Sequence, residues 1–287
     1  MILIADGGST KTHWCLVQAD NQTIDFHSEG YNPYFVEENY IVQSLSKCIP
    51  AGFPINEVHE LYFYGAGVHN EEKADILKRA FGKIFKESKI FIEHDLLGAA
   101  RALLGRKAGF AAILGTGTNT CLYDGKNISY NIDSAAYILG DEGSGCYMGK
   151  QLLKDVIRGT IPAELKEKFD AKYGLSHSEI LDNIYSKPLA NRFCAGFTKF
   201  FDDNMNHPYC QNLIKKAFTD FFSDLVSLYP GYKNYKFNCI GSVGYVFQDI
   251  LKGVAASFGM ETGVLLKSPI DGLKIYHAEV KEPQHNY

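Results

Sequence analysis

The sequence feature that most constrains the fold is a strand–glycine turn–strand pattern that occurs twice, about a hundred residues apart. In the first copy, an apolar run at 2–5 leads into Asp6-Gly7-Gly8-Ser9-Thr10 and then into an apolar run at 12–17. In the second copy, a run at 111–114 leads into Gly115-Thr116-Gly117-Thr118-Asn119 and a run at 120–123. The repetition predicts two related half-molecules with a duplicated strand–glycine turn–strand core.

The segments between the two copies alternate between strand-like and helix-like patterns. Apolar runs at 61–64 and 89–92 have the length and the flanking turn residues of strands. Residues 71–86 carry apolar side chains at three- and four-residue spacing, which predicts an amphipathic helix, and residues 96–104 predict a second helix. This alternation is typical of an α/β architecture, in which helices cover the faces of a sheet.

The two copies imply two domains with a boundary near Gly105-Arg106-Lys107. We therefore predict an N-terminal domain over 1–106 and a C-terminal domain over 107–287, with a mainly helical insertion at about 146–230. No linker rich in Pro, Gly or Ser separates them, so the two domains are expected to pack tightly and to move about a hinge.

Composition argues against several classes of function. The formal net charge of -4 shows no basic excess, which argues against a nucleic-acid partner. No apolar stretch approaches the roughly 18 residues of a membrane span, and the first residues do not resemble a signal peptide, so no membrane partner is expected. The seven cysteines are scattered without a Cys-x-x-Cys pair, which argues against a disulfide framework or a zinc ribbon. We expect a cytoplasmic protein.

The familiar phosphate-binding loops are missing. No Gly-Lys pair is followed by Ser or Thr, so there is no Walker loop. Gly65-Ala66-Gly67 and Gly115-Thr116-Gly117 each lack the third glycine of a dinucleotide-binding turn.

The first glycine turn is nevertheless a candidate phosphate site. Gly7 and Gly8 would adopt positive φ and bring backbone amides to a phosphate. The hydroxyls of Ser9, Thr10 and Thr12 would add further donors. An ordinary hairpin is the alternative, because Asp-Gly favours tight turns. The second turn favours the phosphate interpretation, because two such turns can hold a triphosphate from opposite sides.

Two aspartates end predicted strands and can carry chemistry. Asp6 could hold Mg²⁺ directly or through water. Asp95 follows the strand that starts at Lys89 and precedes a helical run from Leu96. It is either a general base that faces an acceptor hydroxyl or an ordinary helix N-cap, and its position alone does not separate the two roles.

Two more glycine-rich turns precede predicted helices. Gly140-Asp141-Glu142-Gly143-Ser144 leads into a helix at 146–158, and its carboxylates either accept hydrogen bonds from sugar hydroxyls or stabilise the helix terminus. Gly241-Ser242-Val243-Gly244 follows an apolar strand at 237–240. It would let adenine or ribose approach the backbone, or it is a simple strand-to-helix turn.

The order of these motifs resembles that of the sugar kinase/heat-shock ATPase/actin superfamily. The turn at 6–10 resembles its first phosphate motif, the turn at 115–119 its second, and the turn at 241–244 its adenosine motif. Together with Asp95 and the turn at 140–144, the set is similar to the N-acetylglucosamine kinases of the BadF/BadG/BcrA/BcrD ATPase family. The resemblance covers nearly the whole chain and implies two actin-like, ribonuclease H-like domains with an ATP cleft between them.

The resemblance also implies a role for each motif residue. Thr10 and Thr116 would contact the phosphates of ATP, Asp6 would serve Mg²⁺, and Asp95 would be the general base. The residues expected to bind ATP are Gly7, Gly8, Ser9, Thr10, Lys11, Gly115, Thr116, Gly117, Gly241, Ser242 and Gly244. The residues expected to bind the sugar are Asn32, Gly65, Gly67, Asp95, Asn119 and Asp141.

The implied reaction is transfer of the γ-phosphoryl group of ATP to the 6-hydroxyl of an amino sugar. N-acetylglucosamine is the first candidate, N-acetylmuramic acid the second, and glucosamine or glucose less favoured. Ser134-Ala135-Ala136-Tyr137 stands where relatives carry a Gly-Gly-Trp-Gly-like loop that helps shape the sugar pocket, which puts recognition of the acyl group in question.

Two rival functions use the same fold. One is an ATPase that activates an acyl-CoA dehydratase or reductase and shares an iron–sulfur cluster across a dimer, to which the scattered cysteines give little support. The other is a non-catalytic, actin-like nucleotide-binding protein. A homodimer is a reasonable expectation for the assembly.

Overall fold

Each of the two sheets of the protein contains an antiparallel hairpin. Strands β1 (Ile2–Gly7) and β2 (Lys11–Val17) make the first, and β6 (Gly109–Leu114) and β7 (Thr118–Tyr123) make the second. The structure is a computed structural model and describes residues 1–279 except 9, 21 and 69. The chain divides into two compact units. Unit 1 holds Met1–Ala108, Asp124–Ile128 and the segment that begins at Ser268, and unit 2 holds Gly109–Tyr123 and Ser129–Lys267.

The sheet of unit 1 has the strand order β3-β2-β1-β4-β5. The three remaining strands are β3 (Thr23–Glu29), β4 (Glu60–Gly65) and β5 (Lys89–His94). Strands β1, β2 and β3 pair antiparallel, whereas β1, β4 and β5 pair parallel. The parallel strands therefore all end at the same edge of the sheet.

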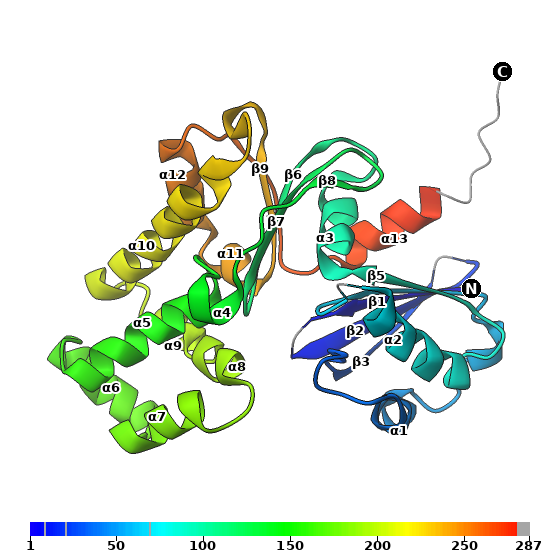
Figure 1. The fold of residues 1–287 in the computed structure, drawn as a ribbon, viewed down its shortest axis with the longest axis horizontal. Helices are drawn as coiled ribbons and strands as arrows, with labels where there is room; N and C mark the ends of the chain where they lie inside the picture. The colour runs from blue at the N-terminus through cyan, green and yellow to red at the C-terminus, as the bar shows by residue number, and fades with distance from the viewer. Residues whose placement is uncertain (9, 21, 69, 280–287) are drawn as a thin grey trace. The chain divides into compact units, whose positions relative to one another are not determined.

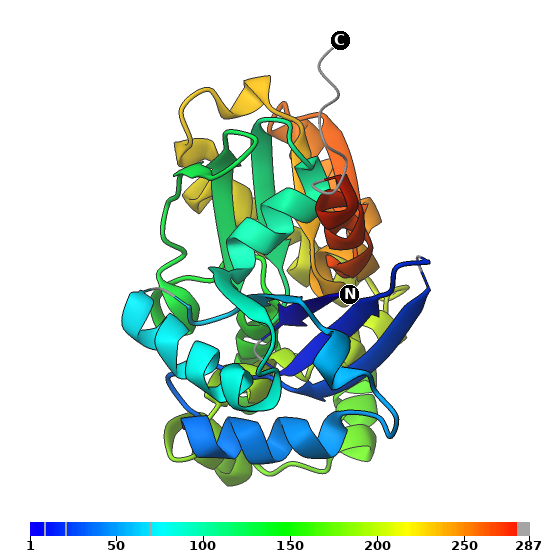
Figure 2. The same ribbon diagram turned by 90° about the vertical axis from the view of Figure 1, so that its right-hand side faces the viewer.

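Helices cover both faces of this sheet (Figure 1). Helices α1 (Glu38–Cys48) and α2 (Glu71–Ile84) lie against one face, side by side in Figure 2, and bury an aromatic core that includes Trp14, Phe63 and Phe81. A short 3₁₀ turn lies at Ile55–Glu57. The other face is covered by α3 (Asp95–Leu104) and α13 (Ile270–Glu279), which pack on Ile4 and Tyr64.

The sheet of unit 2 repeats this arrangement. Its strand order is β10-β9-β6-β7-β8, with β8 at Ile128–Tyr130, β9 at Phe237–Ile240 and β10 at Thr262–Leu266. Strands β6 and β7 pair antiparallel, and β6, β9 and β10 pair parallel. Because β6 takes the place of β1 and β9 that of β4, the predicted duplication of an actin-like core is confirmed.

Most helices of unit 2 lie between β8 and β9. They are α4 (Ala136–Leu139), α5 (Gly145–Arg158), α6 (Ala163–Tyr173), α7 (His177–Tyr185), α8 (Ala190–Ala195), α9 (Thr198–Asp203) and α10 (Pro208–Asp224), followed by 3₁₀ turns at Val226–Leu228 and Tyr232–Asn234. After β9 come α11 (Ser242–Val246) and α12 (Gln248–Ser257). Phe218, Phe221 and Leu251 are fully buried in their common core. Among the residues that the structure describes, none of the helices is long and apolar enough to cross a membrane.

The last helix lies in unit 1, where the predicted domains differ from the structure. The predicted C-terminal domain extended over 107–287, but α13 packs on α3 and β1. Ile270 and Leu273 bury apolar surface in the cluster that contains Ile4 and Tyr64, and this burial explains why the helix joins the first sheet.

Candidate active site

Three predicted site segments meet at one edge of the unit 1 sheet. Gly7 pairs with Gly65, and Gly65 pairs with His94, so β1, β4 and β5 end side by side. The turn after Asp6, the segment after Gly65 and the start of α3 at Asp95 therefore lie next to one another. Ligands commonly bind outside the carboxyl ends of strands in α/β sheets.

The two paired glycines are required by a buried aromatic ring. A Cβ atom at Gly7 would lie 2.5 Å from Cζ of Phe63, and one at Gly65 would lie 2.3 Å from its Cε1. The predicted positive φ at Gly7 and Gly8 is wrong, because neither residue lies in the left-handed region. Close approach to Phe63, rather than turn geometry, explains the glycine at position 7.

The hairpin turn leaves few polar groups for a phosphate. The amide of Gly8 donates to the carbonyl of Lys11 at 3.1 Å, and the buried hydroxyl of Thr12 donates to the carbonyl of Glu29 at 3.1 Å. Thr12 is therefore not the donor that the sequence suggested. Thr10 and Lys11 are exposed, and Ser9 lies outside the described residues.

Asp6 and Asp95 form a pair of like charges at this edge. Burial and the charge of Asp95 raise the pKa of Asp6 to about 7 against the opposing charge of Lys11. A divalent cation would relieve this repulsion, so the residues present fit the predicted Mg²⁺ at Asp6. Within the described part of the chain no three His, Cys, Asp or Glu side chains form a metal cage. This arrangement suits Mg²⁺, which is usually held by one or two carboxylates together with substrate phosphates.

Asp95 is the first residue of α3, and the N-cap residue is His94. The amide of Leu96 donates to Oδ1 of Asp95 at 2.8 Å and lies 3.1 Å from Nδ1 of His94. Nδ1 of His94 lies 2.9 Å from the same carboxylate oxygen. Burial alone would lower the pKa of His94, but the hydrogen bond and charge of Asp95 raise it above its ordinary value. The N-cap alternative for Asp95 is therefore wrong, and its side chain, 24% exposed, has its Oδ1 engaged in these contacts.

Asn32 lies against Gly67 in the same unit. Its Oδ1 accepts a hydrogen bond from the amide of Tyr34 at 3.0 Å, and its carbonyl accepts from the amides of Phe35 and Val36. Gly67 has a φ of +82°, and a Cβ atom there would lie 2.5 Å from Oδ1 of Asn32. The structure thus brings together two residues that the sequence assigned to the sugar site.

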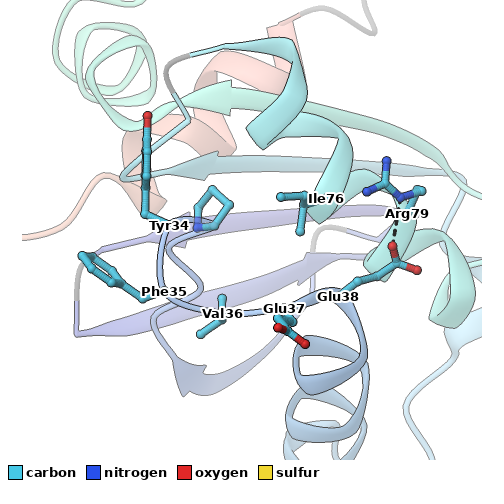
Figure 3. Close-up of a pocket in the computed structure, with 8 residues that line it drawn as sticks. Tyr34, Phe35, Val36, Glu37, Glu38, Ile76 and Arg79 are labelled. Carbon is cyan, nitrogen blue, oxygen red and sulfur yellow. Dashed lines mark hydrogen bonds and ion pairs between the residues drawn. The ribbon is translucent and has the colours of Figure 1, made fainter. Parts of the chain in front are cut away.

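The loop after Asn32 forms one side of a surface cavity of about 370 Å³ (Figure 3). Figure 3 shows Tyr34 and Phe35 on this loop, with Ile76 and Arg79 on α2 and an ion pair between Arg79 and Glu38. Tyr34 is 52% and Phe35 is 70% exposed. No local sequence pattern indicates this cavity, because α2 lies about 40 residues further along the chain.

In unit 2, the Asp141 side chain lies in the turn before α5 and forms a hydrogen bond to the second glycine turn. Its Oδ1 accepts hydrogen bonds from the amide of Thr118 at 3.2 Å and from the hydroxyl of Ser134 at 2.9 Å. Gly117 leaves room for this carboxylate, because a Cβ atom there would lie 2.9 Å from Oδ2. Burial raises the pKa of Asp141, and the bonds from Thr118 and Ser134 oppose the rise. These contacts give Asp141 a structural role, and its predicted contact with a sugar stays a prediction.

The start of α5 also contacts this turn. The amide of Gly145 donates to the carbonyl of Gly115 at 2.8 Å, and the amide of Cys146 donates to the carbonyl of Thr116 at 3.0 Å. Oδ1 of Asn119 accepts from Nδ2 of Asn131 at 3.2 Å. The positions of Thr116 and Asn119 are therefore fixed by neighbouring backbone and side-chain groups.

The segment that departs from the family pattern has an unusual backbone. Ala135, Ala136 and Asp141 all have positive φ, of 58°, 53° and 58°. L-residues other than Asn and Asp rarely adopt this conformation, and such strain persists only where the surroundings impose it. The hydrogen bond from the amide of Asp141 to the carbonyl of Ser134 at 2.9 Å closes the segment.

The third glycine turn borders a second cavity. Gly241 has a φ of +123°, and a Cβ atom there would lie 2.3 Å from the carbonyl oxygen of Leu114. Gly244 is buried, and a Cβ atom there would lie 2.7 Å from Sγ of Cys239, so packing alone requires this glycine. Exposed Ser242 lines a cavity of about 190 Å³. The other lining residues are Thr198, Lys199, Asp202, Val243, Val246 and Phe247.

Sequence reasoning missed the contribution of α9 to this cavity. Thr198, Lys199 and Asp202 lie about 40 residues before the glycine turn, and no local pattern links the two segments. Ligand pockets usually have about 300–1,000 Å³, so this cavity of about 190 Å³ is smaller than a site for a whole ligand.

Several solved structures are similar to this chain over nearly its whole length. A proposed N-acetylglucosamine kinase from Porphyromonas gingivalis is 37% identical, with a TM-score of 0.92 over 97% of this chain and 99% of that chain. The chain belongs to the N-acetylglucosamine kinase-like family. The kinase-like chain thus shares the actin-like fold that the sequence predicted, and the prediction of an ATP-dependent carbohydrate kinase is confirmed at the level of the family.

Two more distant structures share the fold alone with this kinase-like chain. A proposed N-acetylglucosamine kinase from Chromobacterium violaceum is 16% identical, with a TM-score of 0.67 over 96% of this chain and 98% of that one. A ROK family glucokinase from Streptomyces griseus, in complex with glucose and AMPPNP, is 13% identical, with a TM-score of 0.52 over 97% and 98%. No protein-family model matches the chain, and neither does any curated protein sequence. The finer assignment to the BadF/BadG/BcrA/BcrD family stays a prediction.

Proposed function

We propose that the protein transfers the γ-phosphoryl group of ATP to the 6-hydroxyl of an amino sugar, with N-acetylglucosamine as the first candidate and N-acetylmuramic acid as the second. The observation that carries the proposal is the pairing of Asp6 and Asp95 at one edge of the unit 1 sheet. Phosphoryl transfer needs a carboxylate that holds the cation and a group that accepts the proton of the nucleophile, and this pair supplies both.

Asp95 would act as the general base. Its Oδ1 is engaged by the amide of Leu96, so Oδ2 would accept the proton of the sugar hydroxyl. The sugar oxygen forms a bond to the γ-phosphorus, the bond from phosphorus to the bridging oxygen breaks, and ADP leaves. A positioned base contributes roughly 10²–10⁴ in rate, and most of the remaining acceleration comes from alignment and charge stabilisation.

Asn32 would orient the sugar. Because Oδ1 accepts from the amide of Tyr34, the side chain presents Nδ2 as a donor to a sugar hydroxyl. Gly67 keeps the backbone close to this amide. Gly65, Asn119 and Asp141 stay proposed members of the same sugar site.

The nucleotide would use groups from both glycine turns. Thr10, Lys11, Gly115, Thr116 and Gly117 are proposed to contact the phosphates. Mg²⁺, held by Asp6, would neutralise charge on the transferring phosphoryl group. The adenine base is proposed to occupy the cavity at Ser242, where Asp202 could accept a hydrogen bond from its exocyclic amine.

The rival activator ATPase receives little support from the structure. Six of the seven cysteines are buried, and Cys48 is partly exposed. A cluster shared across a dimer needs several thiolates at the surface. A cytoplasmic location and a homodimer stay predictions.

A panel of acceptors tests the proposed function. The protein is incubated with Mg·ATP and N-acetylglucosamine, N-acetylmuramic acid, glucosamine, glucose or water, and products are followed by ³¹P NMR. We expect a sugar phosphomonoester with one acetylated amino sugar, formed well above the rate of ATP hydrolysis in water. Hydrolysis at the same rate with every sugar and with water would contradict the proposal.

A further inference from the structure

A buried tyrosine joins the two helices that cover one face of the unit 1 sheet. The hydroxyl of Tyr64 accepts a hydrogen bond from Nη1 of Arg101 on α3 at 3.0 Å. The same hydroxyl lies 2.9 Å from Nε2 of His277 on α13. Tyr64 is 1% exposed and His277 is 4% exposed. The proposed chemistry uses none of these three side chains.

The surroundings of His277 favour its neutral form. Its ring packs on Tyr62, with ring centroids 3.9 Å apart, and lies near Tyr276. Burial, together with the charges of Arg101 and Arg106, lowers the pKa of His277 to about 4. In the neutral tautomer that carries its proton on Nδ1, His277 accepts at Nε2, so Tyr64 accepts from Arg101 and donates to His277.

The ring of Tyr64 contacts the start of α3. A Cβ atom at Gly98 would lie 2.7 Å from Cγ of Tyr64, so the ring lies directly against the helix backbone there. Gly98 comes three residues after Asp95, which is one helical turn. Tyr64 also immediately precedes Gly65, which pairs with His94 at the end of β5. The tyrosine therefore contacts the elements on both sides of the proposed base.

Helix α13 fixes the other end of α3. A Cβ atom at Gly272 would lie 2.3 Å from the carbonyl oxygen of Ala102, so the backbones of the two helices touch. The guanidinium of Arg101 lies over the ring of Tyr276 at 5.1 Å. Among the described residues, Nε of Arg101 has no hydrogen-bond partner, so its bond to Tyr64 is a main polar anchor of this side chain.

We propose that Tyr64, held between Arg101 and His277, is a positioning residue that sets the place of α3 and thereby of the Asp95 carboxylate. The inference rests on the proposed kinase function, in which Asp95 must reach the sugar hydroxyl. A base acts only within hydrogen-bond distance, and a displacement of about 1 Å can cost roughly 10²-fold in rate.

Four variants test this role. Tyr64→Phe removes the hydroxyl and keeps the ring on Gly98. His277→Leu removes the acceptor, whereas His277→Gln restores an amide acceptor of similar reach. Tyr209→Phe is the control, because its hydroxyl donates to Asp155 at 2.8 Å in unit 2 and its loss removes one partly buried tyrosine hydrogen bond from the other unit.

The kinetic readout separates positioning from general destabilisation. At a temperature where all variants are folded, we expect kcat to fall at least about tenfold in Tyr64→Phe and His277→Leu, while KM for ATP changes by less than about twofold. We expect His277→Gln to recover most of the lost kcat and Tyr209→Phe to keep the kcat of the parent. Parental kcat in Tyr64→Phe would overturn the inference.

Hydrogen exchange provides a readout that does not need activity. The amides of Ala99 and Ala100, in the turn of α3 after Asp95, should exchange faster in Tyr64→Phe than in Tyr209→Phe at equal global stability. If the parent has no kinase activity but these amides exchange faster, the proposed function is wrong and the anchoring of α3 stands. If the parent is active and the amides are unaffected, the positioning role is wrong and the function stands.

Discussion

The side-chain amide of Asn32 occupies the space that a side chain at position 67 would need, because a Cβ atom at Gly67 would lie 2.5 Å from its Oδ1. Gly67→Ala would therefore push Asn32 away from its bond to the amide of Tyr34. We expect KM for the sugar to rise about tenfold, equivalent to about 1.4 kcal/mol of lost binding. Steady-state kinetics with varied sugar would measure this change.

Gly52 supplies the matched control for this substitution. Its φ of +78° is close to that of Gly67, but nothing lies within 4 Å of a Cβ atom there. Gly52→Ala should cost about 1 kcal/mol of stability through backbone strain and leave KM for the sugar unchanged. Equal KM values for the sugar in Gly67→Ala and Gly52→Ala would show that Asn32 does not contact the sugar.

A second glycine test concerns the turn at 115–117. Gly117→Ala would force the Asp141 carboxylate off the amide of Thr118, because a Cβ atom would lie 2.9 Å from Oδ2. Loss of this charge-assisted bond should raise KM for ATP about tenfold. Gly253→Ala, at an exposed helical position with nothing within 4 Å, should be neutral or stabilise by about 0.5–1 kcal/mol. An unchanged KM for ATP in Gly117→Ala would show that this turn does not bind the nucleotide.

The proposed role of the cavity at Ser242 predicts an effect on ATP binding alone. Val246 lines this cavity and is 42% exposed, so Val246→Phe would fill part of its volume of about 190 Å³. We expect KM for ATP to rise about tenfold while KM for the sugar stays within about twofold. Val264, 43% exposed on β10 and outside the cavity, is the control. If Val264→Phe and Val246→Phe have the same KM for ATP, the adenine base binds outside this cavity.

His277 should make stability depend on pH. Its pKa is lowered to about 4 in the folded protein, below the 6.5 of an unperturbed histidine. The folded state therefore binds the proton less readily, so its stability is fully present above pH 6.5 and falls as the pH drops toward 4. This lowering of the pKa of His277 corresponds to a loss of about 3 kcal/mol of stability by pH 4.

Denaturant unfolding of the parent and His277→Gln at pH 7 and pH 4 would measure this effect. The parent should lose more stability than the variant, by about 3 kcal/mol, because the variant has no proton to bind at this site. His59→Gln, at an exposed histidine, should match the parent at both pH values. If the free energies of unfolding of the parent and His277→Gln differ by the same amount at pH 7 and pH 4, His277 does not titrate in this range.

The duplicated core was predictable because its signals are local. Each hairpin joins two apolar runs through a turn of five residues, so a short window contains the whole pattern. Strand β3 (Thr23–Glu29) was missed because only Phe26 and Ser28 of its seven residues are buried, and one of these is polar. Helix α13 was assigned to the second domain because sequence order does not reveal that Leu273 packs on the first sheet.

The site was predictable only as a set of motifs. Asp6 and Asp95 were found because each was predicted at the end of a strand, and the parallel register of β1, β4 and β5 brings these strand ends together. The contact of Asp141 with Thr118 spans 23 residues, and no local signal indicates it. Gly7 was predicted from turn geometry and Gly65 as a sugar-site residue, whereas the ring of Phe63 leaves no room for a Cβ atom at either position.

Replacement of Asp95 by asparagine tests the central claim most directly. Asp95→Asn keeps the size of the side chain and an oxygen that can accept from the amide of Leu96, but it removes the base. With Mg·ATP and the preferred sugar, we expect kcat to fall roughly 10²–10⁴-fold while the variant unfolds at the same denaturant concentration as the parent. A folded Asp95→Asn protein that forms the sugar phosphate at the parental rate would contradict the account.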